Sequence, residues 1–261
     1  MKILTLAPII LIKTGMLSVY RDRSMLITDF FIATSIPFII QAVLWTFVLS
    51  STKEDQFTLS ETYLYYACAL SLNRLHNAYD LITRISRHIN LGQLDCYYVK
   101  PLNYKHQNLF LFIGESSLYL VPPVIIAAYA AYTSGNIINS IVFVALLIPG
   151  QILCFQIGFL LAALTLVVKK PDFILSMHVL CFGVVGGTLL PPSYWPSYLQ
   201  TVMTYNPFRV MIGGPAELLL KPSLALGMEL IVLLFIWTAL LSLLSTALFK
   251  SLQNQYNGAG G

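Results

Sequence analysis

The sequence predicts an all-α integral membrane protein, and its composition and apolar runs support that prediction. Of the 261 residues, 57% are hydrophobic and only 10% are charged, with a mean hydropathy of +0.75. A soluble domain is usually about 25% charged. A surface so poor in charge suits lipid rather than water. The net charge of +4 is too small and too scattered to indicate a nucleic-acid partner.

Six apolar segments are candidates to cross the hydrocarbon core, which takes about 20 residues of helix. They cover residues 28–50, 60–82, 108–132, 139–168, 172–190 and 227–249. The N-terminal run MKILTLAPIILIK has no small-residue cleavage site, so we expect an amphipathic helix at the inner bilayer face rather than a signal peptide. We predict one transmembrane domain over residues 1–257, with residues 258–261 a tail or a remnant of cloning.

The distribution of basic residues predicts how these six spans are oriented in the membrane. With both termini in the cytoplasm, eleven of the 15 Lys and Arg fall on the inner side, three on the outer side, and Arg74 within a span. Cytoplasmic loops of membrane proteins carry such an excess of positive charge. We therefore predict a multi-pass protein with both termini in the cytoplasm.

The segment 191–222, on the predicted outer side, is too apolar for a free loop and too interrupted by proline for a single span. Irregular backbone at membrane depth is tolerated where protein covers it. We expect short helices here that re-enter the outer leaflet.

Polar side chains recur along the second span at helical spacing. Asn73, His76, Asn77, Asp80 and Arg84 would lie on one continuous helical face, with Arg74 beside it. A charge near the bilayer centre costs about 2.5–3.5 kcal/mol, so this face must meet protein or water. Two interpretations remain open: hydrogen bonding between helices, or a polar wall along a pathway or subunit interface.

Two further polar residues lie in other spans. Glu115 in the third span is an expected partner for Arg74 or His76. His178 stands alone in the fifth span, where a hydrogen-bonded core histidine is more common than a ligand.

Motifs for chemistry are missing from the sequence. It has no HExxH, no His/Cys cluster at metal-ligand spacing and no GxxxxGK[ST] phosphate loop. The four cysteines are far apart in the sequence and have no CxxC spacing. We therefore interpret them as small buried hydrophobic residues. We predict no catalytic residue, metal or cofactor in this chain. Transport is the leading functional class. The alternatives are an ion-coupled carrier and an intramembrane hydrolase that uses Ser116 and His178.

Two stretches then show a resemblance to a known family. INLGQLDCYYVKPLN resembles the loop between spans two and three of bacterial type-2 ABC-transporter permeases, through Gly92, Leu94, Asp95, Val99, Lys100, Pro101 and Leu102. GGTLLPPSYWPSYLQTVMTYNPFRVMIGGPAELLL is similar to the family's glycine-bearing fifth span and outer turn, through Gly186, Gly187, Pro192, Pro196, Asn206, Pro207 and Phe208.

The resemblance implies a permease subunit of an ATP-driven exporter in the bacterial inner membrane. In such permeases a cytoplasmic ABC ATPase, present in two copies, binds ATP and Mg and docks on a coupling helix between spans two and three. The permease pairs with a second copy or with a sister permease. The expected cargo is amphiphilic, such as a peptide antibiotic, toxin or drug, with self-resistance of the producer as one role.

Three sets of site residues follow. The predicted ATPase-coupling residues are Arg84, Arg87, Leu91, Gly92, Gln93, Leu94, Asp95, Lys100 and Pro101. The predicted translocation path contains Gln41, Asn73, Arg74, His76, Asn77, Asp80, Glu115, His178 and Phe182. The predicted outer gate contains Pro192, Trp195, Asn206, Pro207 and Phe208.

Overall fold

The computed structural model describes residues 2–51, 57–98, 100, 102–168 and 170–253, and all regular structure in them is helical. The elements, with η for short 3₁₀ or π segments, are α1 (Lys2–Arg21), α2 (Arg23–Phe30), η1 (Phe31–Ser35), α3 (Ile36–Ser51), α4 (Leu59–Leu75), α5 (Tyr79–Asn90), α6 (Asp95–Tyr98), α7 (Tyr104–Ser116), η2 (Ser117–Leu120), α8 (Val121–Ser134), α9 (Ile137–Val168), α10 (Pro171–Leu180), η3 (Cys181–Val185), η4 (Pro192–Tyr194), α11 (Ser197–Tyr205), α12 (Pro207–Met211), α13 (Gly213–Leu220) and α14 (Leu224–Gln253). The fold class predicted from the sequence, all-α and membrane-embedded, is confirmed.

Four apolar helical stretches in the described residues are long enough to cross a membrane. They are Leu26–Ser50, Tyr104–Ser134, Ile137–Thr165 and Leu224–Ser251. They correspond to the first, third, fourth and sixth predicted spans. The fifth is shorter, Pro171–Val185, and ends in the π-helical segment η3. The second is broken into α4 and α5.

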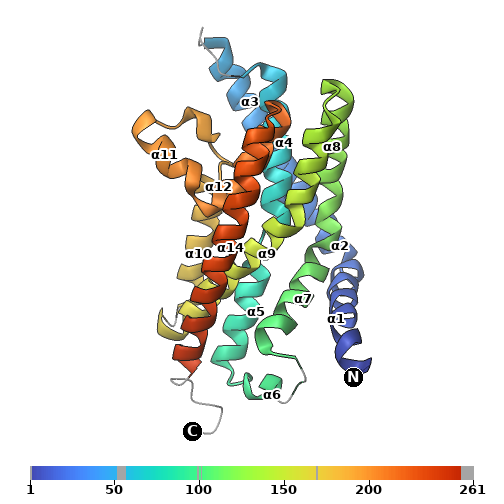
Figure 1. The fold of residues 1–261 in the computed structure, drawn as a ribbon, viewed down its shortest axis with the longest axis vertical. Coiled ribbons are helices and arrows are strands. Elements are labelled where there is room, and N and C mark those ends of the chain that lie inside the picture. The colour runs from blue at the N-terminus through green and yellow to red at the C-terminus, as the bar shows by residue number, and fades with distance from the viewer. Residues whose placement is uncertain (1, 52–56, 99, 101, 169, 254–261) are drawn as a thin grey trace.

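Helix α9 is the centre of the bundle (Figure 1). It packs against α14, α5, α8 and α10. Its aromatic side chains Phe143, Phe155 and Phe159 are almost fully buried. Because buried aromatic rings contribute a large apolar area, this helix is a major part of the core.

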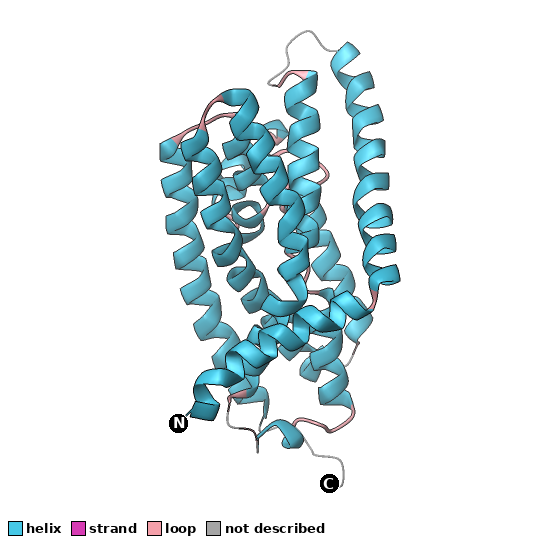
Figure 2. Cartoon of the chain, turned by 90° about the vertical axis from the view of Figure 1, so that its right-hand side faces the viewer, coloured by secondary structure: helices cyan, strands magenta, loops and turns pink. Residues whose placement is uncertain are grey.

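The N-terminal helix lies obliquely across one end of the bundle (Figure 2). It packs closely on α7, where two glycines allow the backbones to touch. A Cβ added at Gly114 would overlap the carbonyl oxygen of Ile12, and one at Gly15 would overlap that of Leu111. Apolar side chains also face outward from α1, including Leu6, Ile9 and Ile10, as suits a helix that contacts lipid.

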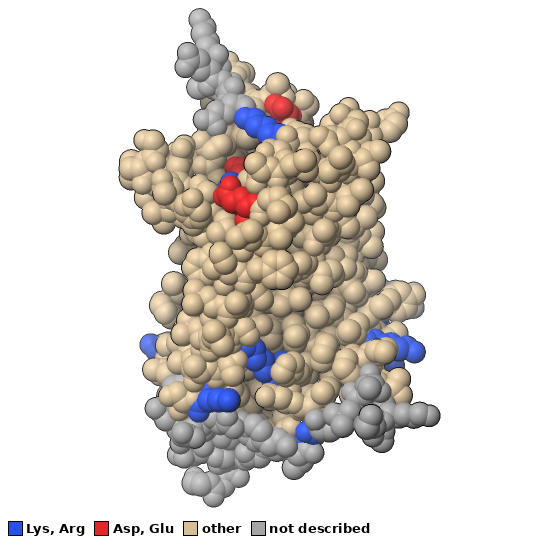
Figure 3. Space-filling view, in the orientation of Figure 1, with Lys and Arg blue, Asp and Glu red and all other residues tan. Residues whose placement is uncertain are grey.

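Helix α1 begins, and α14 ends, at the same end of the molecule (Figure 1). On the face shown in Figure 3, Lys and Arg gather mainly toward that end, and a wide band above it shows neither sign of charge. Charged side chains reappear near the opposite end. An uncharged band between charged ends is the surface expected of a protein that crosses a bilayer.

The segment after η3 forms η4, α11, α12 and α13 at the end opposite the start of α1 (Figure 1). These are the short helices expected in residues 191–222. Pro192 begins η4, and Pro207 stands in the first turn of α12, where the missing N–H of proline costs no hydrogen bond.

Candidate functional site

The polar residues of the second span are not on one continuous helix, which corrects the sequence-based prediction. Helix α4 ends at Leu75 and α5 begins at Tyr79, so His76, Asn77 and Ala78 form a break, here called the hinge. Each hinge residue takes part in a hydrogen bond that a regular helix would not need. The polar pattern was therefore a signal for broken backbone as well as for a polar face.

Side chains from distant elements stabilise the hinge. His76 Nδ1 lies 2.9 Å from Gln151 Oε1 on α9, and His178 Nε2 accepts a hydrogen bond from the Ala78 backbone N–H at 3.3 Å. Asn77 Oδ1 accepts from the Tyr79 N–H at 2.9 Å. Backbone groups freed at membrane depth must find such partners. His178 is thus a hydrogen-bonded core histidine, and its ring lies tilted against that of Phe182 with centroids 4.4 Å apart.

The expected partners of Glu115 are also corrected. Glu115 pairs with Arg84, whereas Arg74 pairs with Asp29 on α2. Asp29 Oδ2 also accepts a hydrogen bond from the Tyr119 hydroxyl at 3.0 Å. Arg74 and Glu115 do line the same cavity of about 290 Å³, here called the charged cavity, between α1, α2, α4 and α7.

A larger cavity of about 700 Å³ lies between η1, α3, α4, α10 and η3, and we call it the lateral cavity. Gln41 and Asn73 from the predicted path line it, with apolar side chains such as Leu70 and Val179. Gln41 is buried, and its Oε1 has no hydrogen-bond partner among the described residues. A smaller cavity of about 90 Å³ adjoins it through shared residues and is lined by Asn77, His178 and Phe182.

The residues predicted for the path thus separate into four groups, of which His178 and Phe182 at the smaller cavity are one. Gln41 and Asn73 line the lateral cavity. Arg74, Asn77, Asp80 and Glu115 line the charged cavity. His76 is buried against α9 at the hinge and lines none of these three cavities.

The two π-helical segments among the described residues both line the lateral cavity. Ala33 belongs to η1, and Gly183 and Val184 belong to η3. A π segment inserts an extra residue into a helix and is frequently found at functional sites. The first and fifth spans are therefore irregular at the depth where the cavity lies between them.

The loop predicted to couple to an ATPase begins at a helix C-cap. The Gln93 N–H donates to the His88 carbonyl at 2.9 Å, and Gly92 takes a φ of +67°, as in a Schellman motif. Leu91 and Gln93 are exposed on this turn, and Arg87 is exposed on α5. The short helix α6 follows, beginning at Asp95.

Two predicted coupling residues point elsewhere, which is a further correction. Leu94 is 1% exposed and packs into the core, because the turn at Gly92 directs it inward. Arg84 donates to Asn108 Oδ1 at 3.3 Å in addition to its ion pair with Glu115. Pro101 lies outside the described residues.

His88 fixes α6 against α7. Its Nδ1 lies 2.9 Å from the Tyr104 hydroxyl and its Nε2 lies 3.1 Å from the Tyr97 hydroxyl. Burial, reinforced by the charges of Arg84, Lys100 and Arg87, lowers the pKa of His88 below its ordinary value. The neutral imidazole is therefore the form that holds this contact at neutral pH.

The predicted gate residues hold the outer segment together. Asn206 Oδ1 caps α12 by accepting from the Arg209 N–H at 2.7 Å, and Phe208 packs edge-on against Phe182 with ring centroids 5.1 Å apart. Pro192 is buried beside Gly187 and Gly213. Trp195 ends η4 and is half-buried.

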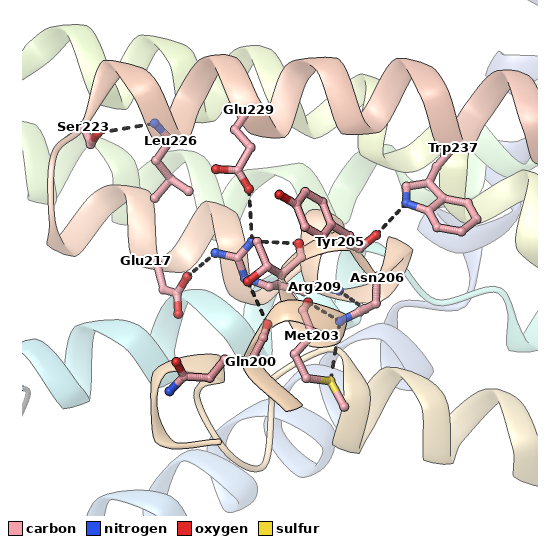
Figure 4. A network of polar contacts seen from close by, with 11 residues as sticks. Gln200, Met203, Tyr205, Asn206, Arg209, Glu217, Ser223, Leu226, Glu229 and Trp237 are labelled. Atoms are coloured by element: carbon pink, nitrogen blue, oxygen red, sulfur yellow. Dashed lines mark hydrogen bonds and ion pairs between the residues drawn. The ribbon is translucent and has the colours of Figure 1, made fainter. Parts of the chain in front are cut away.

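A buried ion pair joins α12 to α13 within the same segment (Figure 4). Arg209 Nη2 lies 2.9 Å from Glu217 Oε2, and Arg209 Nη1 donates to the Thr204 carbonyl at 3.1 Å. Glu229 on α14 stands 4.0 Å from the guanidinium. Sequence reasoning placed Arg209 among outer basic residues and missed this pair, because its partners come from later helices.

Sequence reasoning also missed Lys105 and Asp29. Lys105 Nζ lies 2.8 Å from both Ser245 Oγ and Thr246 Oγ1 on α14, so it joins α7 to the last helix. Both residues are charged and lie at the edge of an apolar run. That position was the available signal, because such a charge needs a partner within the protein.

Ser116 and His178, the pair considered for an intramembrane hydrolase, have separate roles. Ser116 Oγ donates to the Phe112 carbonyl of its own helix at 2.9 Å, while His178 accepts from Ala78. No hydrogen bond joins the two within the described part of the chain. Nor do its His, Cys, Asp and Glu side chains form a group that could hold a metal ion.

Comparison with known proteins assigns the chain to a family. A model of the ABC-2 family transporter protein matches residues 32–260, most of the chain. No curated protein matches the chain. Members of this family are transmembrane subunits of ABC transporters that generally work with a separate ATPase subunit. The chain belongs to the ABC-2 transporter family, as a permease subunit.

Proposed function

We propose that this permease forms, with a cytoplasmic ABC ATPase, an ATP-driven exporter of an amphiphilic cargo, and that the lateral cavity is part of its translocation path. The single observation that supports this most is the cavity of about 700 Å³ between the first, second and fifth spans, which Gln41 and Asn73 line together with apolar side chains. A buried polar group without a partner costs about 1–3 kcal/mol. Gln41 Oε1 is buried without a partner among the described residues, so the side chain would have to turn toward the cavity to bond a passing cargo.

The chemistry of the cavity supports an amphiphilic cargo. Asn73, Ser176 and Thr188 supply polar groups, whereas Leu70, Leu175 and Leu180 supply apolar surface. Ligand sites typically combine a mainly apolar lining with a few placed polar groups. A peptide antibiotic, toxin or drug has both kinds of surface.

The assembly we propose has two copies of the ATPase and two permeases, the second being another copy or a sister permease. ATP and Mg would bind to the ATPase, because the sequence of this chain has no phosphate-binding loop. Both termini would lie in the cytoplasm and the spans in the bacterial inner membrane. The excess of Lys and Arg on the side of the loop at Leu91–Lys100 supports this orientation.

The ATPase contact we propose is the turn at the end of α5. Leu91 is 55% exposed there, and Arg87, Gln93 and Lys100 are exposed around it. The cluster of His88, Tyr97 and Tyr104 ties this turn to α7. A push on the turn would therefore reach the third span as well as the second.

The test is transport in proteoliposomes that contain the permease with its ATPase. We expect uptake of a fluorescent amphiphilic peptide to require ATP and to fall at least tenfold when Gln41→Leu and Asn73→Leu are combined. Thr133→Val is the matched control, because Thr133 is exposed on α8 and bonds only to carbonyls of its own helix.

Two outcomes would contradict the proposal. Uptake that runs on a proton or sodium gradient without ATP would identify an ion-coupled carrier. Unchanged ATP-dependent uptake in the double variant would remove the lateral cavity from the path.

A further inference from the structure

A fourth cavity, of about 310 Å³, lies where α7 begins and α14 ends, beside α6. We call it the basic cavity. Lys100, Lys105 and Lys250 line it, together with the exposed His106. The proposed ATPase contact includes Lys100, but no proposed transport or coupling step accounts for Lys105 and Lys250 beside it in one cavity.

The positive charge of this cavity has no acidic counterpart in the described residues. Its lining includes no Asp or Glu, and none of the three lysines takes part in an ion pair there. Lys105 Nζ is held by neutral oxygens of Ser242, Ser245 and Thr246, which leave its charge uncompensated. Lys100 Nζ stands 3.9 Å from the centroid of the Tyr97 ring.

The remaining wall of the basic cavity is aromatic. Tyr104 and Phe249 stack with ring planes 15° apart, and Phe159 lies 5.0 Å from Phe249 between centroids. All three rings are largely buried. The lysine ammonium groups beside this packed wall form a site for an anion, and Leu102 is a partly exposed apolar residue of the same lining.

The position of the cavity along the spans points to lipid. Lys105 is the second residue of the apolar stretch Tyr104–Ser134, and Lys250 is the penultimate residue of Leu224–Ser251. Both stretches are long enough to cross the bilayer, so their ends lie where hydrocarbon meets the headgroups. Basic pockets between helices at this depth on the cytoplasmic side suit anionic headgroups.

We infer that the basic cavity binds the phosphate group of an anionic phospholipid from the inner leaflet, with its acyl chain beside Leu102. The bound lipid would join the loop at Lys100 to the end of α14 at Lys250. Removing it would loosen the contact between the ATPase-facing loop and the last span. The site itself requires neither an ATPase nor a cargo.

The test is a lipid titration of the delipidated full-length permease, followed by native mass spectrometry. We expect phosphatidylglycerol to bind more tightly than phosphatidylcholine. Each lysine near such a headgroup contributes about fivefold in affinity, so Lys100→Gln with Lys250→Gln should weaken phosphatidylglycerol binding about 30-fold. Both side chains are exposed, and each single variant should lose about fivefold.

The matched control removes two exposed lysines from the same predicted side, Lys13→Gln with Lys170→Gln, and should leave binding within twofold. Equal losses in both double variants would overturn the site, as would equal binding of the two lipids.

A separate competition experiment adds inorganic phosphate to the permease with bound phosphatidylglycerol. If millimolar phosphate displaces phosphatidylglycerol, the cavity takes free phosphate and the lipid assignment is wrong.

Discussion

At the scale of residues, ion pairs tie the first three spans together. Arg84 and Glu115 are each 23% exposed in their side chains, and Arg74 and Asp29 are each 20% exposed. Charges so far from bulk water cost free energy unless paired. These pairs therefore stabilise one arrangement of α2, α4, α5 and α7.

A double-mutant cycle on Arg84→Gln and Glu115→Gln tests the revised pairing. Each single change leaves the partner's charge unpaired, so the two effects on the free energy of unfolding should be non-additive by roughly 1–2 kcal/mol. Thermal or denaturant unfolding in detergent measures this. Arg74→Gln with Glu115→Gln is the matched control and should be closer to additive. Additivity in the Arg84 cycle would mean that the pair contributes nothing.

At the scale of elements, helices made of uninterrupted apolar sequence were predictable and interrupted ones were not. Helices α9 and α14 follow from composition alone. The hinge at His76–Ala78 could not be predicted, because the groups that stabilise it, Gln151 and His178, come from helices far along the chain. The inward direction of Leu94 depends in the same way on the turn at Gly92.

The contact between α1 and α7 gives a prediction at this scale. Gly114→Ala places a methyl group against the Ile12 carbonyl, so α1 must move, at a cost of about 1–3 kcal/mol in the free energy of unfolding. Gly183→Ala is the control, because nothing lies closer than 3.9 Å to a Cβ there. Thermal unfolding in detergent should show a lower midpoint for the first variant only. Equal midpoints would show that α1 does not pack on α7 in solution.

At the scale of the whole molecule, the sequence predicted the fold class and the family, while the arrangement of the site required the structure. The basic residues and the apolar runs predicted the topology of the membrane spans. The motifs in the loop and in the outer segment indicated the permease family, which the family match confirms. Which polar residues share a cavity depends on how α3, α4 and α10 meet. Gln41 and Asn73 do share one, whereas His76 does not.

The central claim is that a separate ATPase drives this permease through the turn at the end of α5. Its most direct test is ATP hydrolysis by the purified ATPase with and without the permease. Leu91→Asp should abolish both binding and stimulation, because Leu91 is the exposed apolar residue of that turn. Leu224→Asp, at the exposed start of α14, should keep both. Full stimulation by the Leu91→Asp permease would contradict the account.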